Sequence, residues 1–247
     1  MSEPIRIAMW SGPRNISTAM MRSFENRPDT AVIDEPFYAA FLKATGIDHP
    51  MREESMASQP NDPWVVVEQI LGPVPGDRPI WYQKHMTHHM VGGFPRDWIT
   101  GMRNAFLIRA PEDVLASYVQ KREDVTLDDI GFVSQAELFD REAQRLGHPP
   151  PVVHGEDVLA DPKGTLEALC AGLGIPFSDA MLSWPAGARA TDGAWAPVWY
   201  ASVQRSTGFS APRAPATRDQ LSSHLQRIAD AARPHYEKLL AFKLRAS

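Results

Sequence analysis

Cysteine and long apolar runs are both scarce in this sequence of 247 residues. The single cysteine, Cys170, excludes a disulfide framework within the chain, and its apolar neighbours LEALCAGLG favour a buried helical position. No run approaches the roughly 18 apolar residues of a membrane span, and the N-terminus MSEPIRIAMW does not have the pattern of a signal peptide. We therefore expect a cytoplasmic protein that does not enter a membrane.

An excess of basic residues is absent as well. The chain has 25 Lys and Arg against 30 Asp and Glu, for a formal net charge of -5. A broad nucleic-acid interface needs a basic surface, so we expect no nucleic-acid partner. The hydrophobic content of 43% is enough for a sizeable core, and the length fits a single α/β domain over residues 1–247. The oligomeric state is left open by the sequence.

Short apolar runs alternate with helical patterns along the chain. Such an alternation predicts a doubly wound fold with three layers, α/β/α, around a mostly parallel sheet, in which the first strand, turn and helix resemble a P-loop. The predicted strands are IRIAM (5–9), AVI (31–33), IWYQK (80–84), NAFLIR (104–109) and PVVH (151–154).

Helix ends are indicated by capping residues. Asp62 and Pro63 predict a helix start that ends at Gly72, and Thr217 with Gln220 predicts a capping box for the last helix, which Pro234 should kink or split. Residues rich in Pro, Ala, Gly and Ser predict a long ordered loop at 183–216 that could act as a lid. Three further helices are predicted: one with an apolar stripe of Ile16, Met20 and Phe24, one over 111–122, and a long amphipathic one over 126–146.

The stretch WSGPRNISTAMM (10–21) follows the first predicted strand. Unpaired backbone N–H groups at a helix start attract anions, the hydroxyls of Ser17 and Thr18 add donors, and Arg14 adds a positive charge. The P-loop pattern of nucleoside triphosphatases needs a second glycine and a lysine, but Ile16 and Ser17 occupy those positions. A site for a phosphate without the Mg²⁺-triphosphate signature is one interpretation, and an ordinary turn with a Ser/Thr cap is the other.

A second basic residue, Arg109, ends a predicted strand, and Ser117 lies in the helix that follows. Ligands of open α/β sheets bind at the carboxyl ends of the strands, so both residues are placed where a ligand binds. The alternative role for Arg109 is a surface salt bridge with Glu112 or Asp113.

Three segments resemble the motifs of sulfotransferases that use 3′-phosphoadenylyl sulfate, and the resemblance covers roughly residues 5 to 180. The 5′-phosphosulfate loop of that family is usually written P-[KR]-S-G-T-[ST], and PRNIST departs from it at Asn15 and Ile16. The stretch RAPEDVLASY fits the family pattern R-x-P-x-D-V-x-x-S-Y, and VVHGEDVLADPKGTLEALCAGLGIPF resembles a third segment. The resemblance implies that Arg109 and Ser117 bind the 3′-phosphate and that no metal is needed. It implies these donor-loop residues: Gly12, Pro13, Arg14, Asn15, Ile16, Ser17 and Thr18.

Sulfuryl transfer needs a general base within hydrogen-bond reach of the acceptor hydroxyl. VIDEPFY places Asp34 and Glu35 after the second strand, and a subset of bacterial sulfotransferases has a catalytic glutamate in a similar context, so the resemblance favours Glu35 as the base. A helix cap before Pro36 is the alternative role for both carboxylates. YQKHMTHHM matches the family lysine with Lys84, which implies an electrostatic role. The histidine in the acceptor pocket is His88 or His89, while His85 also competes as a base.

Three histidines this close could also suggest a metal, but no Asp, Glu or Cys stands nearby in the sequence. The rival enzyme class is a small-molecule or nucleotide kinase with Asp34 as its base, and the non-catalytic rival is a nucleotide-binding protein. The expected acceptor is a small molecule with a hydroxyl group. SVQRSTGFS (202–210) is either a nucleotide-covering loop or a plain surface turn, and its candidate residues are Arg205, Ser206, Thr207 and Gly208. Aromatic pocket walls are suggested by Trp64, Trp81, Trp98, Trp184, Trp195 and Trp199.

Overall fold

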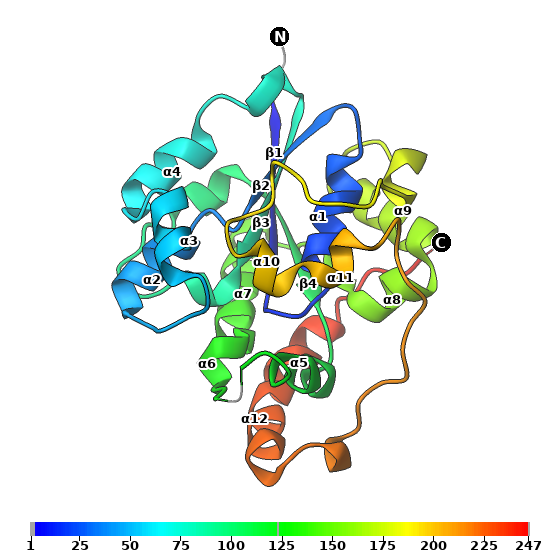
Figure 1. Cartoon of the computed structure of the whole chain (residues 1–247). Helices are drawn as coiled ribbons and strands as arrows, with labels where there is room; N and C mark the ends of the chain where they lie inside the picture. Colours follow the sequence, from blue (N-terminus) through cyan, green and yellow to red (C-terminus); the bar gives the residue numbers. More distant parts are fainter. Residues whose placement is uncertain (1–2, 123, 247) are drawn as a thin grey trace.

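Five short strands form one parallel sheet in the computed structural model, which describes residues 3–122 and 124–246 (Figure 1). The strand order is β2-β3-β1-β4-β5, and every neighbouring pair is parallel. The predicted α/β fold class is therefore confirmed. The strands are β1 (Ile5–Ser11), β2 (Thr30–Asp34), β3 (Ile80–Met86), β4 (Arg103–Ile108) and β5 (Val152–His154).

The strand order places a switch point beside β1. The chain adds β2 and β3 on one side of β1 and then crosses to the other side for β4 and β5. In open α/β sheets a ligand binds at such a point, outside the carboxyl ends of the strands. The loop after β1 and the residue after β4 carry Arg14 and Arg109, so both arginines meet at this position.

Side chains of β1 alternate between two hydrophobic cores, because successive residues of a strand point to opposite faces. Ile7 and Met9 pack with α1 (Ser17–Glu25) and α9 (Pro162–Gly172) on one face. The next residues along the strand, Ala8 and Trp10, pack on the other face. That face is covered by α4 (Pro63–Leu71), α7 (Phe132–Leu146) and α12 (Ser223–Leu240).

Several sequence-based helix predictions are confirmed. The Asp62 side chain accepts a hydrogen bond from the Trp64 backbone N–H at 2.9 Å, Pro63 is the first residue of α4, and Gly72 ends it. Cys170 is buried in α9. The other helices are α2 (Tyr38–Thr45), α3 (Arg52–Ser58), α5 (Pro111–Tyr118), α6 (Leu127–Ile130), α8 (Gly155–Ala160), α10 (Ala196–Trp199) and α11 (Ala201–Gln204). The 3-10 turns are η1 (Pro75–Asp77), η2 (Thr87–His89), η3 (Asp97–Gly101), η4 (Asp179–Leu182) and η5 (Arg218–Gln220).

The single long helix predicted over 126–146 is wrong. Gly131 has a φ of 70° and separates α6 from α7, so the chain turns between two helices there. This break brings the Gly131 backbone against η2, where the Thr87 hydroxyl donates to the Gly131 carbonyl at 3.0 Å. The helix predicted over 111–122 is also too long, because the N–H groups of Lys121 and Arg122 both turn back to the Tyr118 carbonyl.

The start of the last helix was also predicted wrongly. The capping box of Thr217 and Gln220 exists, but it caps the turn η5, whereas α12 begins at Ser223 with Ser222 as its cap. α12 then continues through Pro234 without being split. A proline removes a single N–H donor from a helix, and the packed apolar side of α12, which includes Ala232 and Tyr236, holds the helix on either side of it.

Residues 183–216, the covering segment, are ordered and contain the short helices α10 and α11. In Figure 1 this segment, coloured yellow to orange, passes in front of the sheet and α1 and then runs down one side of the domain. Its Gly208 pairs with Ser183 in an isolated bridge, so the two parts of the segment are tied together near its base. A role as a lid stays a prediction.

Candidate active site

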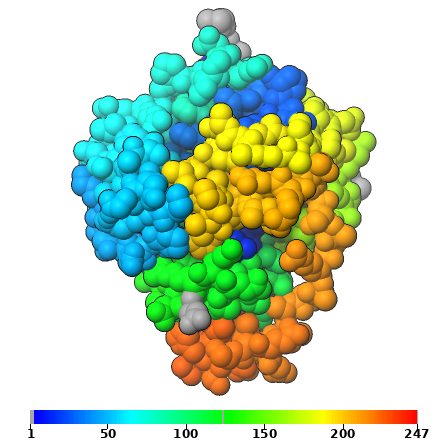
Figure 2. All heavy atoms as spheres, viewed as in Figure 1, coloured from blue at the N-terminus to red at the C-terminus, as the bar shows by residue number. Residues whose placement is uncertain are grey.

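One cavity of about 480 Å³ lies between the ends of the strands and the covering segment. Its wall includes residues from the loop after β1, from the ends of β2 and β3, from α5 and from the covering segment. Figure 2 shows the covering segment lying across this face of the molecule, with a small blue area of the N-terminal part visible beneath it. Segments far apart in the sequence therefore meet around one space.

Two residues of the loop after β1 have the left-handed backbone conformation that usually requires glycine, although neither is a glycine. Arg14 and Ile16 have φ angles of 61° and 53°, and Ile16 stands at the position where the family pattern has glycine. A left-handed conformation costs a non-glycine residue on the order of 1–3 kcal/mol and persists where the surroundings impose it. The buried Asn15 is part of those surroundings, since its side-chain amide donates to the Leu107 carbonyl of β4 at 3.3 Å.

The first turn of α1 faces the cavity. Ser17, Thr18 and Ala19 line the wall, and no side chain caps the helix at Ile16. Unpaired N–H groups at such a helix start form an anion site. The predicted residue Gly12 does not line the cavity; it allows close packing instead, because a Cβ there would lie 2.5 Å from the Ile130 carbonyl oxygen.

Arg14, Arg109 and Ser117 lie together at the switch point. The Arg14 Nε donates to Ser117 Oγ at 2.9 Å, and the Arg109 guanidinium donates to the Arg14 carbonyl at 3.0 Å. Burial and the nearby charge of Arg109 lower the pKa of Arg14. The Arg109 partner expected as the alternative, Glu112 or Asp113, is wrong. Arg109 pairs with Glu156 at 2.9 Å, while Glu112 pairs with Arg233 and Asp113 accepts from the Ala216 N–H.

A buried lysine connects the ends of β2 and β3. Lys84 Nζ, whose side chain is 1% exposed, donates to Asp34 Oδ1 at 2.9 Å, Glu35 Oε1 at 2.5 Å and the Tyr200 hydroxyl at 2.8 Å. Burial alone would lower the pKa of Lys84, but the charges of Asp34 and Glu35 outweigh it and raise that pKa well above its ordinary value. Burial raises the pKa of Glu35, and the neighbouring charge of Asp34 adds to the rise despite the opposing charge of Lys84.

The two adjacent carboxylates have different surroundings. Asp34 accepts from Lys84 on one oxygen, and its other oxygen accepts from the Tyr200 hydroxyl at 2.7 Å and the Gly193 N–H at 3.2 Å. Glu35 lines the cavity and has a φ of 43°, a left-handed conformation that is strained for this residue type. Asp34 is therefore fixed in place, whereas Glu35 is held where it can meet a ligand.

The three candidate histidines separate into two groups. His88 and His89 line the cavity, and His89 stacks on Tyr38 with ring centroids 4.9 Å apart. Burial lowers the pKa of His88 to about 3 and that of His89 well below its ordinary value, so both are neutral near pH 7. His85 does not line the cavity: it is buried and stacks on Trp10 at 4.8 Å. His85 therefore packs in the core and does not face the cavity.

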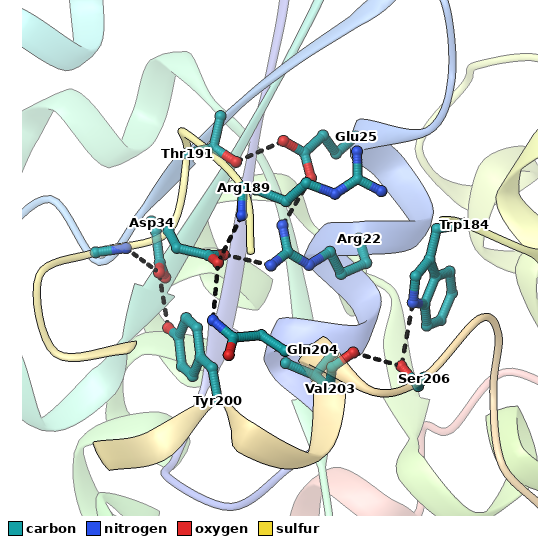
Figure 3. A network of polar contacts seen from close by, with 12 residues as sticks. Arg22, Glu25, Asp34, Trp184, Arg189, Thr191, Tyr200, Val203, Gln204 and Ser206 are labelled. Carbon is teal, nitrogen blue, oxygen red and sulfur yellow. Dashed lines mark hydrogen bonds and ion pairs between the residues drawn. The ribbon is translucent and has the colours of Figure 1, made fainter. Parts of the chain in front are cut away.

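The late loop contributes unevenly. Arg205, Ser206 and Gly208 line the cavity, so this loop is not a plain surface turn. The Ser206 hydroxyl is already engaged, since it donates to the Val203 carbonyl at 2.7 Å and accepts from Trp184 at 3.1 Å (Figure 3). Thr207 is not part of the wall; its carbonyl accepts from the Trp184 N–H at 3.1 Å.

Several wall residues were missed by sequence reasoning. Tyr200 and Arg213 come from the covering segment, where no motif marks them, and Tyr38 and His49 come from α2 and the residues after it. The number of tryptophans was a partial signal for this wall. Only Trp195 and Trp199 line the cavity, whereas Trp81, Trp98 and Trp184 are buried elsewhere and Trp64 is exposed.

Two properties of the described residues bear on other kinds of site. Within 3–122 and 124–246, no three or more His, Cys, Asp or Glu side chains are grouped so that they could hold a metal ion. Over the same residues, none of the helices combines the length and the apolar character that crossing a bilayer requires.

Comparison with known proteins identifies the family. The family model described as a sulfotransferase domain matches residues 5–245, so the chain belongs to the sulfotransferase family. Its fold resembles the sulfotransferase domain from the curacin biosynthetic pathway, with a TM-score of 0.54, 16% identity, and coverage of 99% of this chain and 100% of that one. A sulfotransferase from Alicyclobacillus acidocaldarius gives a TM-score of 0.55, 14% identity, and coverage of 99% and 98%.

Curated relatives are longer than this chain. Branched-chain-amino-acid aminotransferase-like protein 1 of Arabidopsis thaliana is 40% identical over 214 residues, which are 86% of this chain and 38% of that protein. The corresponding protein 2 is 37% identical over 207 residues, which are 84% and 36%. The chain thus spans less than two fifths of the length of these relatives.

Proposed function

We propose that the chain transfers the sulfuryl group of 3′-phosphoadenylyl sulfate to a hydroxyl of a small-molecule acceptor. The observation that carries the proposal is one cavity wall that contains the first turn of α1, the Arg109–Ser117 pair, and the Lys84–Glu35 pair. The α1 turn and the Arg109–Ser117 pair can bind the phosphate groups of a donor. The Lys84–Glu35 pair can take part in a proton transfer.

The distribution of positive charge in the cavity wall supports 3′-phosphoadenylyl sulfate as the donor. Arg14, Arg205 and Arg213 line the cavity, and none of them has a carboxylate partner among the described residues. Arginine binds phosphate oxygens through several N–H donors at once. In this proposal the 5′-phosphosulfate lies at the first turn of α1, the 3′-phosphate lies at Arg109 and Ser117, and no metal is required.

The chemical step balances with these residues. The acceptor oxygen attacks sulfur, the bond from sulfur to the bridging phosphate oxygen breaks, and 3′,5′-adenosine bisphosphate leaves with that electron pair. The acceptor proton passes to Glu35, whose raised pKa favours proton uptake. The ammonium of Lys84 stabilises the negative charge that develops beside it.

A small acceptor is supported by an aromatic part of the wall. His49 stacks on Trp199 with centroids 5.5 Å apart, Tyr38 meets Trp195 edge to face at 4.8 Å, and Arg14 lies over the Trp199 ring at 5.9 Å. Burial lowers the pKa of His49 to about 4, so this ring is uncharged near pH 7. Flat uncharged walls beside the arginine-rich region fit a compact hydroxyl compound rather than a polymer. From the net charge of -5 we propose no nucleic-acid partner, and we keep the expectations of no membrane partner and a cytoplasmic setting as proposals.

The rival activities fit the geometry less well. A kinase with Asp34 as its base would use a carboxylate that already accepts from Lys84, Tyr200 and Gly193. A protein that only binds nucleotides has no need for Glu35 and Lys84 in the same wall as its arginines.

A thermal-shift comparison tests the proposal. We expect 3′,5′-adenosine bisphosphate to raise the melting temperature more than AMP, and Arg109→Ala to remove most of the difference, because a charge-assisted contact contributes about 1.5–3 kcal/mol. Arg78→Ala, which removes an arginine outside the cavity wall, is the control and should keep the difference. Equal shifts with both ligands, or a larger shift with ATP and Mg²⁺, would contradict the proposal and favour the kinase.

A further inference from the structure

Tyr200 joins the covering segment to the reacting groups. Its side chain is buried, and its hydroxyl has three partners: it accepts from Lys84 Nζ at 2.8 Å, accepts from Trp195 Nε1 at 3.0 Å, and donates to Asp34 Oδ2 at 2.7 Å. Burial and the charge of Asp34 raise the pKa of Tyr200 well above its ordinary value, so the phenol stays neutral and keeps its proton to donate. Figure 3 shows this hydroxyl pointing to Asp34.

We propose that Tyr200 is a positioning residue that fixes the direction of the Lys84 ammonium and thereby links closure of the covering segment to sulfuryl transfer. The proposal rests on the proposed function, because the direction of the Lys84 ammonium affects the rate only if negative charge develops beside it during sulfuryl transfer. Nothing in the sequence marks Tyr200, since it lies outside every motif that the family resemblance contributes.

The geometry explains why a third partner matters. A lysine has a flexible four-carbon stem and three N–H donors. Here those donors are used on Asp34, Glu35 and Tyr200. When Glu35 takes up the acceptor proton, its contact with Lys84 weakens, and the ammonium then depends on its remaining partners. With both Asp34 and Tyr200 in place, two contacts still define its direction; with Asp34 alone, it can swing.

The covering segment supplies more than the phenol. Gly193 donates its N–H to Asp34, and Trp195 donates to Tyr200, so three residues of one segment surround the lysine–aspartate pair. The segment is also attached to α1 through Asp192, which accepts a hydrogen bond from Arg22 at 2.5 Å. Lys84 is therefore fully positioned only while the segment is in place, and this explains how a change in the segment could reach the chemistry.

Three further titratable side chains lie on the elements packed around Lys84, Asp34 and Glu35. Tyr38 of α2 and Tyr82 of β3 both have raised pKa values because they are buried, and His89 of η2 has a lowered one, so all three are uncharged. The charges that act on Glu35 are therefore those of Asp34 and Lys84. Among the groups around Glu35, the Tyr200 hydroxyl acts as a hydrogen-bond donor that lowers the pKa of Glu35, so loss of the phenol should raise that pKa further.

Tyr200→Phe and Tyr82→Phe form a matched pair of variants. Tyr82 is fully buried in β3, the strand that also carries Lys84, but its hydroxyl has no hydrogen-bond partner among the described residues. Each variant removes one buried hydroxyl, and only Tyr200→Phe removes contacts to Lys84 and Asp34. With 2-naphthol as the probe acceptor, we expect Tyr200→Phe to lower kcat roughly tenfold to a hundredfold, with the affinity for 3′,5′-adenosine bisphosphate unchanged and the acid limb of the rate moved to higher pH. Tyr82→Phe should leave all three unchanged.

A second readout needs no substrate. In protein labelled at lysine with ¹⁵N and ¹³C, Lys84→Met identifies the Lys84 signal, and nuclear relaxation reports the mobility of its side-chain end. We expect greater mobility in Tyr200→Phe and wild-type mobility in Tyr82→Phe. Equal mobility of the Lys84 side chain in the two variants would overturn the positioning role. Equal kcat values for the two variants, given an active wild type, would overturn it as well. A wild type that transfers no sulfuryl group to 2-naphthol and gives equal thermal shifts with 3′,5′-adenosine bisphosphate and AMP would refute the proposed function. The mobility comparison would still decide whether Tyr200 positions Lys84.

Discussion

Asp34 and Glu35 are neighbours in the chain, but three donors fix Asp34 while Glu35 reaches the cavity. This difference predicts which carboxylate accepts the proton. We expect Glu35→Gln, which keeps the size and removes the base, to lower the rate roughly 10²- to 10⁴-fold. Binding of 3′,5′-adenosine bisphosphate, measured by calorimetry, should be nearly unchanged. Full activity in Glu35→Gln together with its loss in His88→Ala or His89→Ala would move the base to a histidine.

The same residue predicts a pH dependence. A base acts only when ionised, and burial raises the pKa of Glu35 above its ordinary value of 4.5. On acidification the rate should therefore fall at a higher pH than an ordinary carboxylate would give. With a pKa of about 3, His88 is mostly neutral between pH 4 and 9 and adds no further fall in rate over that range. A rate profile from pH 4 to 9 checks this, and a limb that persists unchanged in Glu35→Gln would contradict it.

Gly131, at the break between α6 and α7, predicts a measurable difference between two glycines. Gly131→Ala places a Cβ at positive φ and 2.6 Å from Thr87 Oγ1, whereas Gly147→Ala, at a φ of 74°, meets nothing within 4 Å. Positive φ costs alanine roughly 1–2 kcal/mol at either position. We expect Gly131→Ala to lower the free energy of unfolding by more than Gly147→Ala does, as measured by urea denaturation. Equal losses would mean that the contact with Thr87 relaxes freely.

Sequence reasoning located elements better than it located their breaks. The strands and the start of α4 depend on local patterns, such as apolar runs and the Asp62 cap, so they could be predicted. The break at Gly131 serves a contact with Thr87, and no local pattern contains both residues. The same holds for the site. Arg109 and Ser117 lie within one motif and could be predicted from the sequence. Tyr200 and Arg213 line the cavity because of the path of the covering segment, which no local pattern indicates.

At the scale of the whole molecule, a buried ion pair helps to hold the covering segment over the cavity. Asp192 accepts from Arg22, whose side chain is 1% exposed, and this pair ties the covering segment to α1. We expect Asp192→Asn to speed cleavage by trypsin after Arg189 and Arg205 and to weaken binding of 3′,5′-adenosine bisphosphate, because losing one partner of a buried pair leaves the other poorly compensated.

Asp179→Asn is the control for this variant, since Asp179 lies 80% exposed in the preceding turn and has one distant partner, Lys163 at 3.7 Å. Its cleavage pattern and nucleotide affinity should match those of the wild type. Gel analysis of timed digests gives the comparison, and identical digests of the two variants would show that the Arg22–Asp192 pair does not hold the segment.

The left-handed backbone of Ile16 has a consequence for how relatives of this chain can be found. A φ of 53° at an isoleucine means that the shape of the donor loop is imposed by its neighbours, such as the Asn15 anchor, and not by the freedom of a glycine. A search pattern that demands glycine at this position would pass over such proteins, although their loops have the same course. The backbone angles of the residue before α1, followed by an arginine and a serine eight positions apart after a later strand, would be a more inclusive signature.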